Sequence, residues 1–309
     1  MPRASGALIA HGTLSLIKTT SSGSLGSQER GACQHLCVAP SRHAEHAYAL
    51  CWYNKLWHDT SAASIRYLEA AGCQHGTLRK RRLSPTGESR PMQIVSVNIG
   101  KAEALAHAKA SGTTGIFKRP LSTPALVTAL GLVGDVICDT ENHGGVDQAV
   151  YVYGVPDYQW WSDALGRPLP AGTFGENLTI TELVSADLAI GDRLHISSVV
   201  LEVTAPRIPC VTLARRMTDP AFLTRFRAAE RPGVYCRVIC EGRVKVGDAV
   251  RYEPYLGETL TARELFRDFF APQKDVATLR RHLAAPIAIR DRVVKEQELR
   301  ELLGDKEPQ

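Results

Sequence analysis

Residues 193–210 read RLHISSVVLEVTAPRIPC, and this stretch combines a strong strand pattern with the most distinctive cysteine of the chain. Leu194 and Ile196 alternate with polar neighbours, as in a half-buried strand, and β-branched residues dominate the run VVLEVT that follows. The apolar run ends at a proline and Cys210, with Arg207 three residues before the cysteine. We therefore expect two strands that lead to a thiol on a stiff turn.

Comparable short strand-like segments recur at Ile94–Ile99, Ala149–Tyr153, Val234–Cys240 and Ala249–Tyr252. Gly-Asp pairs mark turns at 134–135, 191–192 and 247–248. Many short strands separated by Gly and Pro turns favour a β-barrel or sandwich over a parallel α/β sheet. Helical spacing adds a few peripheral helices at 157–165, 211–217 and 220–229. We predict a mainly β domain over residues 92–254.

The hydrophobic period becomes helical after Tyr255. Thr261 and Glu264 form a capping box, and two further amphipathic helices are expected at 275–283 and 287–303. We predict a three-helix C-terminal domain over 255–309. Its helices can present a partner-binding surface, but packing against one another and the β domain is the simpler expectation.

The charge of the chain is unevenly distributed. The 309 residues include 37 Lys and Arg and 32 Asp and Glu, a net charge of +5. Residues 1–91 hold 11 of these basic and 5 of these acidic residues, a net of +6, which leaves −1 for residues 92–309. The basic excess therefore belongs to the first segment, and we expect no stable nucleic-acid binding.

Residues 1–91 differ in composition from the rest. They are rich in Ser, Ala, Gly and His, they show no sustained amphipathic period, and strand character begins abruptly at Met92. We predict a largely disordered extension, with an over-long start as one explanation. The chain has no apolar run of about 18 residues and no dense cysteine framework, so we expect no membrane span, reduced cysteines and a cytoplasmic location.

Two glycine-containing turns are candidate ligand sites. One is Asn142-His143-Gly144-Gly145, followed by Asp147, where glycine lets the backbone approach a ligand and exposed amides suit an anion. The other is Gly175-Glu176-Asn177, whose side chains can hydrogen-bond a heterocycle. The plainer alternative for each is a tight turn with a solvated polar tip.

Cys210 has three possible roles on these residues alone. It can be a small buried hydrophobe, a nucleophile with His143 as base, or a soft metal ligand. A helix is expected just after it, and a helix N-terminus together with Arg207 lowers a thiol pKa. No oxyanion-hole or nucleophile-elbow motif accompanies it, which disfavours the nucleophile.

The order of the motifs resembles one family. The motifs are HGGVDQAVY at 143–151, FGENLT at 174–179, IGD at 190–192, PRIPC at 206–210, GVYCRV at 233–238 and VGD at 246–248. Together they resemble the MOSC domain, named for the C-terminus of molybdenum cofactor sulfurase, from about Met92 to Tyr252. The helical segment resembles the C-terminal extension of stand-alone bacterial MOSC proteins, which reduce N-hydroxylated bases such as hydroxylaminopurine.

The resemblance implies a β-barrel that holds a pyranopterin molybdenum cofactor, with Cys210 as a thiolate ligand to molybdenum. The two turns would line the pocket through Asn142, Gly144, Gly145, Gly175, Glu176 and Asn177. On chemical grounds Arg207 is the candidate for the cofactor phosphate. His143 or Asp147 would supply a proton.

The resemblance also implies partners. Substrates would be N-hydroxylated small molecules or bases. Electrons would come from a separate reductase, because the sequence shows no convincing flavin, haem or iron–sulfur signature. A homodimer and pyridoxal phosphate binding are further expectations. The alternatives are a sulfur-carrier or cofactor-handling module with a persulfide on Cys210, and a binding module without turnover.

Overall fold

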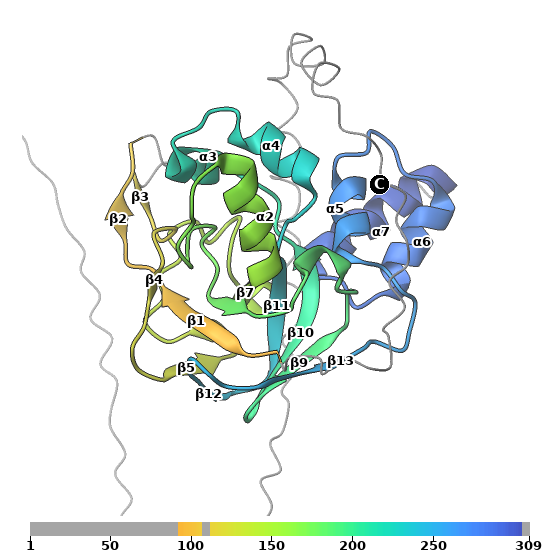
Figure 1. Ribbon diagram of the computed structural model, residues 1–309. Coiled ribbons are helices and arrows are strands. Elements are labelled where there is room, and N and C mark those ends of the chain that lie inside the picture. Colours follow the sequence, from red (N-terminus) through yellow and green to blue (C-terminus); the bar gives the residue numbers. More distant parts are fainter. Residues whose placement is uncertain (1–91, 107–111, 305–309) are drawn as a thin grey trace, which may run out of the picture. The chain divides into compact units, whose positions relative to one another are not determined.

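The structure is a computed structural model that describes residues 92–106 and 112–304 (Figure 1). The extension predicted for residues 1–91 lies outside the described residues. The described part combines one large sheet, two small sheets and several helices. The mainly β character expected from the sequence is confirmed.

The large sheet has eight strands in the order β13-β9-β10-β11-β7-β8-β1-β4. The strands are β1 (Ile94–Ile99), β4 (Arg119–Pro120), β7 (Val150–Gly154), β8 (Leu178–Ile180), β9 (Arg193–Ile196), β10 (Val199–Pro206), β11 (Val234–Cys240) and β13 (Val250–Glu253). Neighbours are antiparallel except β7 and β8, which are parallel. A parallel pair needs a crossover connection, and here it contains helix α2 (Val155–Leu165).

Backbone contacts also join two distant regions of this sheet. Gln93 forms an isolated antiparallel bridge with Ala249, and the Val250 N–H donates to the carbonyl of Met92 at 2.8 Å. These contacts connect the start of β1 with the start of β13. They do not make a named strand pair, so the closed barrel stays a prediction.

Two small sheets accompany the large one. The first contains β12 (Gly242–Val244), β5 (Ala125–Thr128) and β6 (Gly131–Leu132). The second contains β2 (Glu103–Ala104) and β3 (Thr113–Thr114). Their short segments carry too few residues for a clear alternating pattern, and the sequence did not predict them.

The buried side chains form an aliphatic and an aromatic cluster. The aliphatic cluster contains the inward residues of the strands, among them Leu194, Ile196 and Leu201. The aromatic cluster contains Trp161 on α2 and Phe226 on α4 (Phe222–Ala229), whose rings stack with centroids 5.8 Å apart. Figure 1 shows α2, α3 (Val211–Met217) and α4 grouped above the strands. The helices predicted for these three segments are confirmed.

The three C-terminal helices are also confirmed, as α5 (Ala262–Phe269), α6 (Val276–Ala284) and α7 (Ile289–Leu303). The capping box forms, because Thr261 Oγ1 accepts from the Glu264 N–H while Glu264 accepts from the Thr261 N–H. Leu265 joins the aliphatic cluster and Phe266 the aromatic one. Helix α5 therefore shares the core of the sheet, and the domain boundary at 254/255 stays a prediction.

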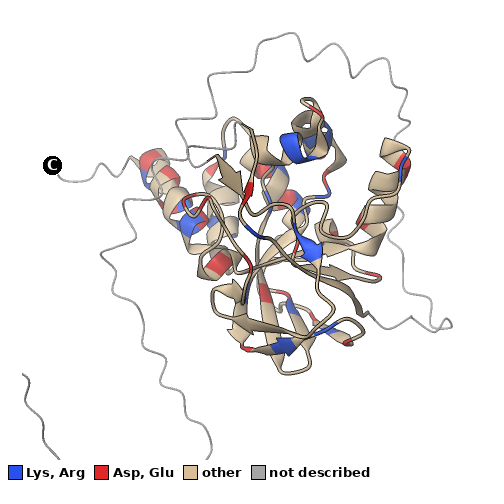
Figure 2. Ribbon diagram, turned by 90° about the vertical axis from the view of Figure 1, so that its left-hand side faces the viewer, with Lys and Arg blue, Asp and Glu red and all other residues tan. Residues whose placement is uncertain are grey.

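Charged residues of both signs are interspersed on the described part. Figure 2 shows basic and acidic segments side by side on its helices. Within the described residues, none of the helices is both long and apolar enough to cross a membrane.

Candidate active site around Cys210

Cys210 lies between the end of β10 and the start of α3. β10 ends at Pro206, and Cys210 is the extended residue immediately before α3, with φ −124° and ψ 164°. Its side chain is half-buried. The sequence predicted this strand, turn and helix order, and the structure confirms it.

His143 is the main polar neighbour of the Cys210 thiol. It forms a hydrogen bond with the thiol, and its Nδ1 lies 3.2 Å from the hydroxyl of Tyr235 on β11. The imidazole therefore bridges a thiol and a buried phenol. Cys210 and His143 are 67 positions apart in the chain, and the sheet brings them together.

The pKa of the Cys210 thiol is set by opposing effects. Burial raises this pKa. The hydrogen bond and charge of His143, the charge of Arg207 and the N–H of Leu213 together lower it by more than burial raises it. The result is a pKa of about 6, below the ordinary value of a thiol. The thiolate therefore predominates at pH 7, and a thiolate is both the nucleophilic and the metal-binding form of cysteine.

Alkylation of Cys210 in cofactor-free protein is expected to follow a titration midpoint near pH 6. His143→Ala should move this midpoint upward by about 1–3 pH units, because it removes an effect that lowers the thiol pKa. Peptide-resolved mass spectrometry after iodoacetamide pulses measures the midpoint. His195→Ala on β9 is the matched control and should leave it unchanged. A wild-type midpoint at the ordinary thiol value would contradict this account.

Arg207 is buried beside the same thiol, with 6% of its surface exposed. Its guanidinium carbon lies 5.0 Å from the ring centroid of Tyr151, a cation–π arrangement. Burial lowers its pKa, but Tyr235, Tyr151 and Cys210 raise it by more, so the group stays charged. Its Nε has no hydrogen-bond partner among the described residues. A buried cation with an unused donor suits an anionic ligand.

The Gly175-Glu176-Asn177 turn approaches the site through its backbone. Gly175 has φ 78°, and a Cβ there would lie 3.1 Å from Ile116 Cγ1 and 3.4 Å from Arg207 Nη1. Glycine therefore permits both the conformation and the close approach to Arg207.

The side chains of Glu176 and Asn177 are engaged within the protein. Glu176 Oε1 accepts from the Tyr158 hydroxyl and the Gly172 N–H, each at 2.6 Å. Asn177 donates to Asp135 at 2.9 Å and accepts from the Tyr151 N–H at 3.1 Å. In this structure both side chains brace the turn. The predicted direct contact with a cofactor would have to use the second Glu176 oxygen, which is buried without a partner.

The other glycine turn divides its polar residues between two directions. His143 faces Cys210, whereas Asn142 donates to Asp139 at 2.7 Å and 2.8 Å. Gly144 and Gly145 both have positive φ, near 80°. Asp147, in the short helix η2 (Val146–Gln148), accepts from the Ile289 N–H of α7 at 2.6 Å.

Asp147 also forms an ion pair with Arg237, at 3.0 Å between Oδ1 and Nε. Both carboxylate oxygens therefore have partners, one on β11 and one at the start of α7. Of the two predicted proton donors, His143 interacts with the thiol, whereas Asp147 is not among the groups that shift the thiol pKa.

Asp147→Ala is expected to lower the free energy of unfolding by about 2 kcal/mol, because it removes the charge-assisted hydrogen bond from the Ile289 N–H and the closer of the two ion pairs of Arg237. The alkylation midpoint of Cys210 should stay near pH 6. Chemical denaturation and the alkylation assay measure the two quantities. Asp163→Ala, at an exposed carboxylate on α2, should be neutral in both. A displaced midpoint in Asp147→Ala would instead place Asp147 in the Cys210 site.

Three residues of the site have no role predicted from sequence. Tyr235 and Tyr151 flank Arg207, and Tyr235 also contacts His143. Lys118 is buried and forms an ion pair with Asp135, and the charge of Arg207 lowers its pKa. Tyr151 and Tyr235 are part of the sequence motifs HGGVDQAVY and GVYCRV, so the motifs could have pointed to them. Lys118 lies outside these motifs, and no sequence pattern around it indicates a role.

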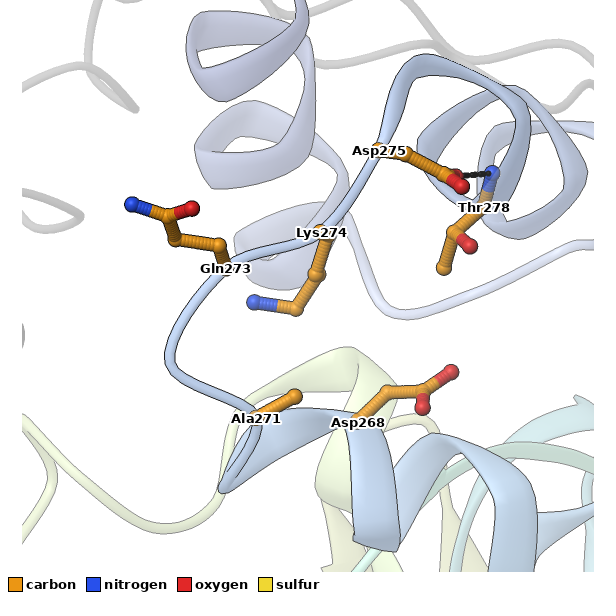
Figure 3. A pocket seen from close by; sticks show the side chains of 6 residues that line it. All are labelled: Asp268, Ala271, Gln273, Lys274, Asp275 and Thr278. Carbon is orange, nitrogen blue, oxygen red and sulfur yellow. Dashed lines mark hydrogen bonds between the residues drawn. The ribbon is translucent and has the colours of Figure 1, made fainter.

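An open hollow of about 470 Å³ lies elsewhere, among the C-terminal helices. Figure 3 shows its lining residues, Asp268, Ala271, Gln273, Lys274, Asp275 and Thr278. The Asp275 carboxylate accepts from the Thr278 N–H at 2.7 Å and so caps α6. None of the Cys210 site residues lines this hollow. It is therefore a separate surface feature.

A metal at Cys210 would have a single cysteine ligand from this chain. The described residues contain no group of three or more His, Cys, Asp and Glu side chains arranged to hold a metal ion. The low-pKa thiol and the unused Nε donor of Arg207 instead fit a metal that is already bound by an anionic cofactor. The residues present fit such a group.

Comparisons with known proteins agree with this fold. The model of the MOSC domain matches residues 139–251. The chain is 37% identical over 154 residues to the uncharacterized protein YflK of Bacillus subtilis, an alignment that covers 50% of this chain and 70% of YflK. The chain therefore belongs to the MOSC domain family.

Two further relatives place it within this family. The crystal structure of YiiM from Geobacillus stearothermophilus superposes with a TM-score of 0.57 at 26% identity, over 68% of this chain and 100% of YiiM. A Gibberella moniliformis protein named "Reductase" is 34% identical over 143 residues, which cover 45% of this chain and 25% of that protein. The chain is thus similar to the stand-alone YiiM and YflK proteins.

Proposed function

We propose that this protein is a molybdenum-cofactor-dependent reductase of N-hydroxylated compounds such as hydroxylaminopurine, with Cys210 as the thiolate ligand to molybdenum. The observation that carries the proposal is the Cys210 thiol of pKa about 6 beside the buried Arg207, whose Nε has no hydrogen-bond partner among the described residues. Membership of the MOSC family and the fungal relative named "Reductase" support it.

The reaction is a two-electron reduction. The N–O bond of the hydroxylamine breaks, two electrons and two protons are taken up, and the products are the amine and water. When bound, the cofactor would supply the electron pair, and a separate electron-donating protein would replenish it. Cys210 would hold the metal and Arg207 the cofactor phosphate.

His143 has the position of a proton carrier in this site. It contacts the Cys210 thiol on one side and the Tyr235 hydroxyl at 3.2 Å on the other. An imidazole exchanges protons readily near neutral pH. Tyr235 is itself buried in the aromatic cluster, and Asp147 of the same turn accepts from the first residue of α7.

A second candidate function is a sulfur carrier with a persulfide on Cys210. The half-buried thiolate favours it, because a thiolate reacts with sulfur donors. Pyridoxal phosphate binding, a cytoplasmic location and a homodimer stay predictions.

Metal content distinguishes these functions. Protein purified from a host that makes the molybdenum cofactor is expected to contain molybdenum and to reduce hydroxylaminopurine with an artificial electron donor. Intact mass spectrometry would reveal a persulfide on Cys210. Molybdenum-free protein that carries the persulfide would favour the sulfur carrier, and a cofactor-loaded protein that never reduces the substrate would be a binding module.

A further inference from the structure

Helix α3 begins directly after Cys210 and carries two adjacent arginines. Arg215 and Arg216 lie in its last turn. Because an α-helix rises about 1.5 Å per residue, they lie roughly 7–9 Å from Cys210 along the helix axis. The helix thus connects these arginines with the proposed metal ligand.

Arg216 packs on a chain segment that also reaches Arg207. Its guanidinium carbon lies 4.8 Å from the ring centroid of Phe117, a cation–π arrangement. The preceding residue, Ile116, comes close to Gly175, since a Cβ on this glycine would lie 3.1 Å from Ile116 Cγ1. The same Cβ would lie 3.4 Å from Arg207 Nη1. Side-chain packing therefore joins Arg216 to the site as well.

Further charged residues surround these arginines on β2 and β4. Arg119 of β4 is exposed and forms a bidentate ion pair with Glu103 of β2. Arg215 Nη1 donates to the carbonyl of Ala106 at 2.9 Å, and the exposed Lys101 lies just before β2. We call Lys101, Arg119, Arg215 and Arg216 the basic face. Strands β2 and β4 and helix α3 lie on the left in Figure 1, and this side is turned toward the viewer in Figure 2.

The basic face has a surplus of positive charge. The carboxylates around it have partners of their own: Glu103 pairs with Arg119, Asp135 with Lys118 and Asp219 with Arg225, while Asp139 accepts from Asn142 and Glu176 from Tyr158. Within residues 92–106 and 112–304, neither Arg215 nor Arg216 forms a salt bridge, and the Nε of each is buried without a hydrogen-bond partner. Residues 92–309 have a net charge of −1, so this surplus is a local feature.

The folded chain does not compensate the charge of Arg216. Burial lowers the pKa of this partly buried side chain, which means that its surroundings disfavour the charged form. A partly buried cation without a salt bridge lowers stability unless a ligand or a partner balances it. A partner with negative charge would supply this balance.

An acidic protein matches the basic face better than a nucleic acid does. Duplex DNA carries one charge per about 1.7 Å of its axis and binds to extended basic tracks. The basic face is short, and Glu103 lies within it. Complementary charges at a protein–protein interface steer and orient the partners, which suits the small, transient complexes of electron-transfer proteins.

We propose that the basic face is the docking surface for an electron-donating protein with an acidic surface, which docks beside Cys210 at α3. This inference deepens the proposed function and rests on it, because it needs a redox centre at Cys210. The partner is oxidised by two electrons for each substrate molecule reduced, and solvent supplies the two protons. No covalent bond forms between the two proteins.

The test measures binding of two acidic electron carriers, a flavodoxin and a plant-type ferredoxin, to the full chain from a host that makes the molybdenum cofactor. Wild type should bind at least one of them in biolayer interferometry. The double variant Arg215→Gln/Arg216→Gln should bind it about tenfold more weakly. Glu103→Gln should bind it about two- to threefold more tightly, because it removes the carboxylate within the basic face.

The matched control is Arg300→Gln, an exposed arginine in the last turn of α7, which should bind like wild type. Raising the ionic strength from about 0.01 M to about 0.15 M shortens the Debye length from about 30 Å to about 8 Å. This change should weaken binding by wild type more than binding by the double variant. With a small chemical electron donor, all these variants should reduce hydroxylaminopurine as wild type does.

Three outcomes overturn the proposal. Wild type binds neither carrier, or a folded double variant and Glu103→Gln both bind like wild type. In the third, duplex DNA binds more tightly than either carrier at the same ionic strength and is lost in the double variant, which would assign the face to nucleic acid.

These outcomes are separate from those that test the reductase. A chain without molybdenum that still binds a carrier through Arg215 and Arg216 would refute the reductase and keep a surface for acidic proteins. A molybdenum-containing chain that is active with the chemical donor, and whose carrier binding none of the variants alters, would keep the reductase and refute the docking surface.

Discussion

Replacing Cys210 with serine should reduce both the molybdenum content and the reduction of hydroxylaminopurine to background. Serine is close to cysteine in size, but its hydroxyl stays protonated near neutral pH and is a harder ligand than a thiolate. The loss should exceed the roughly 10–100-fold reduction seen when a residue that only hydrogen-bonds to a metal ligand is removed. Elemental analysis and an assay with an artificial electron donor measure the two quantities.

The control for this variant is Cys240→Ser. Cys240 ends β11 and is exposed, so its substitution should leave metal content and activity unchanged. Equal molybdenum content and activity in wild type and Cys210→Ser would exclude Cys210 as the ligand and, with it, the proposed reductase. A variant that keeps its metal but loses only activity would give Cys210 a different role.

Phe174→Ala should have the largest effect on stability, a loss of about 3–5 kcal/mol in the free energy of unfolding. Phe174 is fully buried, and its ring stacks on Tyr153 with centroids 4.6 Å apart. It also contacts Trp161 and Phe222 of the aromatic cluster. Alanine would leave a cavity among rigid rings that cannot close around it.

Urea denaturation measures this loss. Leu130→Ala is the control, since Leu130 is 69% exposed and its truncation should change stability by less than about 0.5 kcal/mol. A Phe174→Ala variant about as stable as the Leu130→Ala control would show that the aromatic cluster does not hold the turn. Metal binding should weaken together with stability, because Gly175 beside Arg207 follows Phe174 directly.

Local patterns predicted the elements around the site correctly. Leu194 and Ile196 are fully buried on β9, as their alternation with polar residues indicated. Thr261 and Glu264 form the expected capping box. Such patterns depend on side chains within a few residues of one another, so the chain displays them before it folds.

The partners of polar side chains were less predictable. Glu176 and Asn177 looked like ligand groups, yet the structure pairs them with Tyr158 and Asp135. Asp147 looked like a proton donor, yet it holds the first turn of α7. Each partner comes from a segment that is distant in sequence, and a one-dimensional pattern carries no information on which segments meet.

The sequence by itself determined the strand pattern, the C-terminal helices, the family and the candidate cysteine, because motif order and periodicity are properties of the chain. Only the tertiary structure decided which residues surround that cysteine. Tyr235 on β11 pairs with Ala205 on β10 and with Tyr151 on β7, and this pairing brings His143, Arg207 and Cys210 to one place. The thiol pKa of about 6 is a consequence of this arrangement, because burial and the charges of residues distant in sequence change the pKa only after the strands pair.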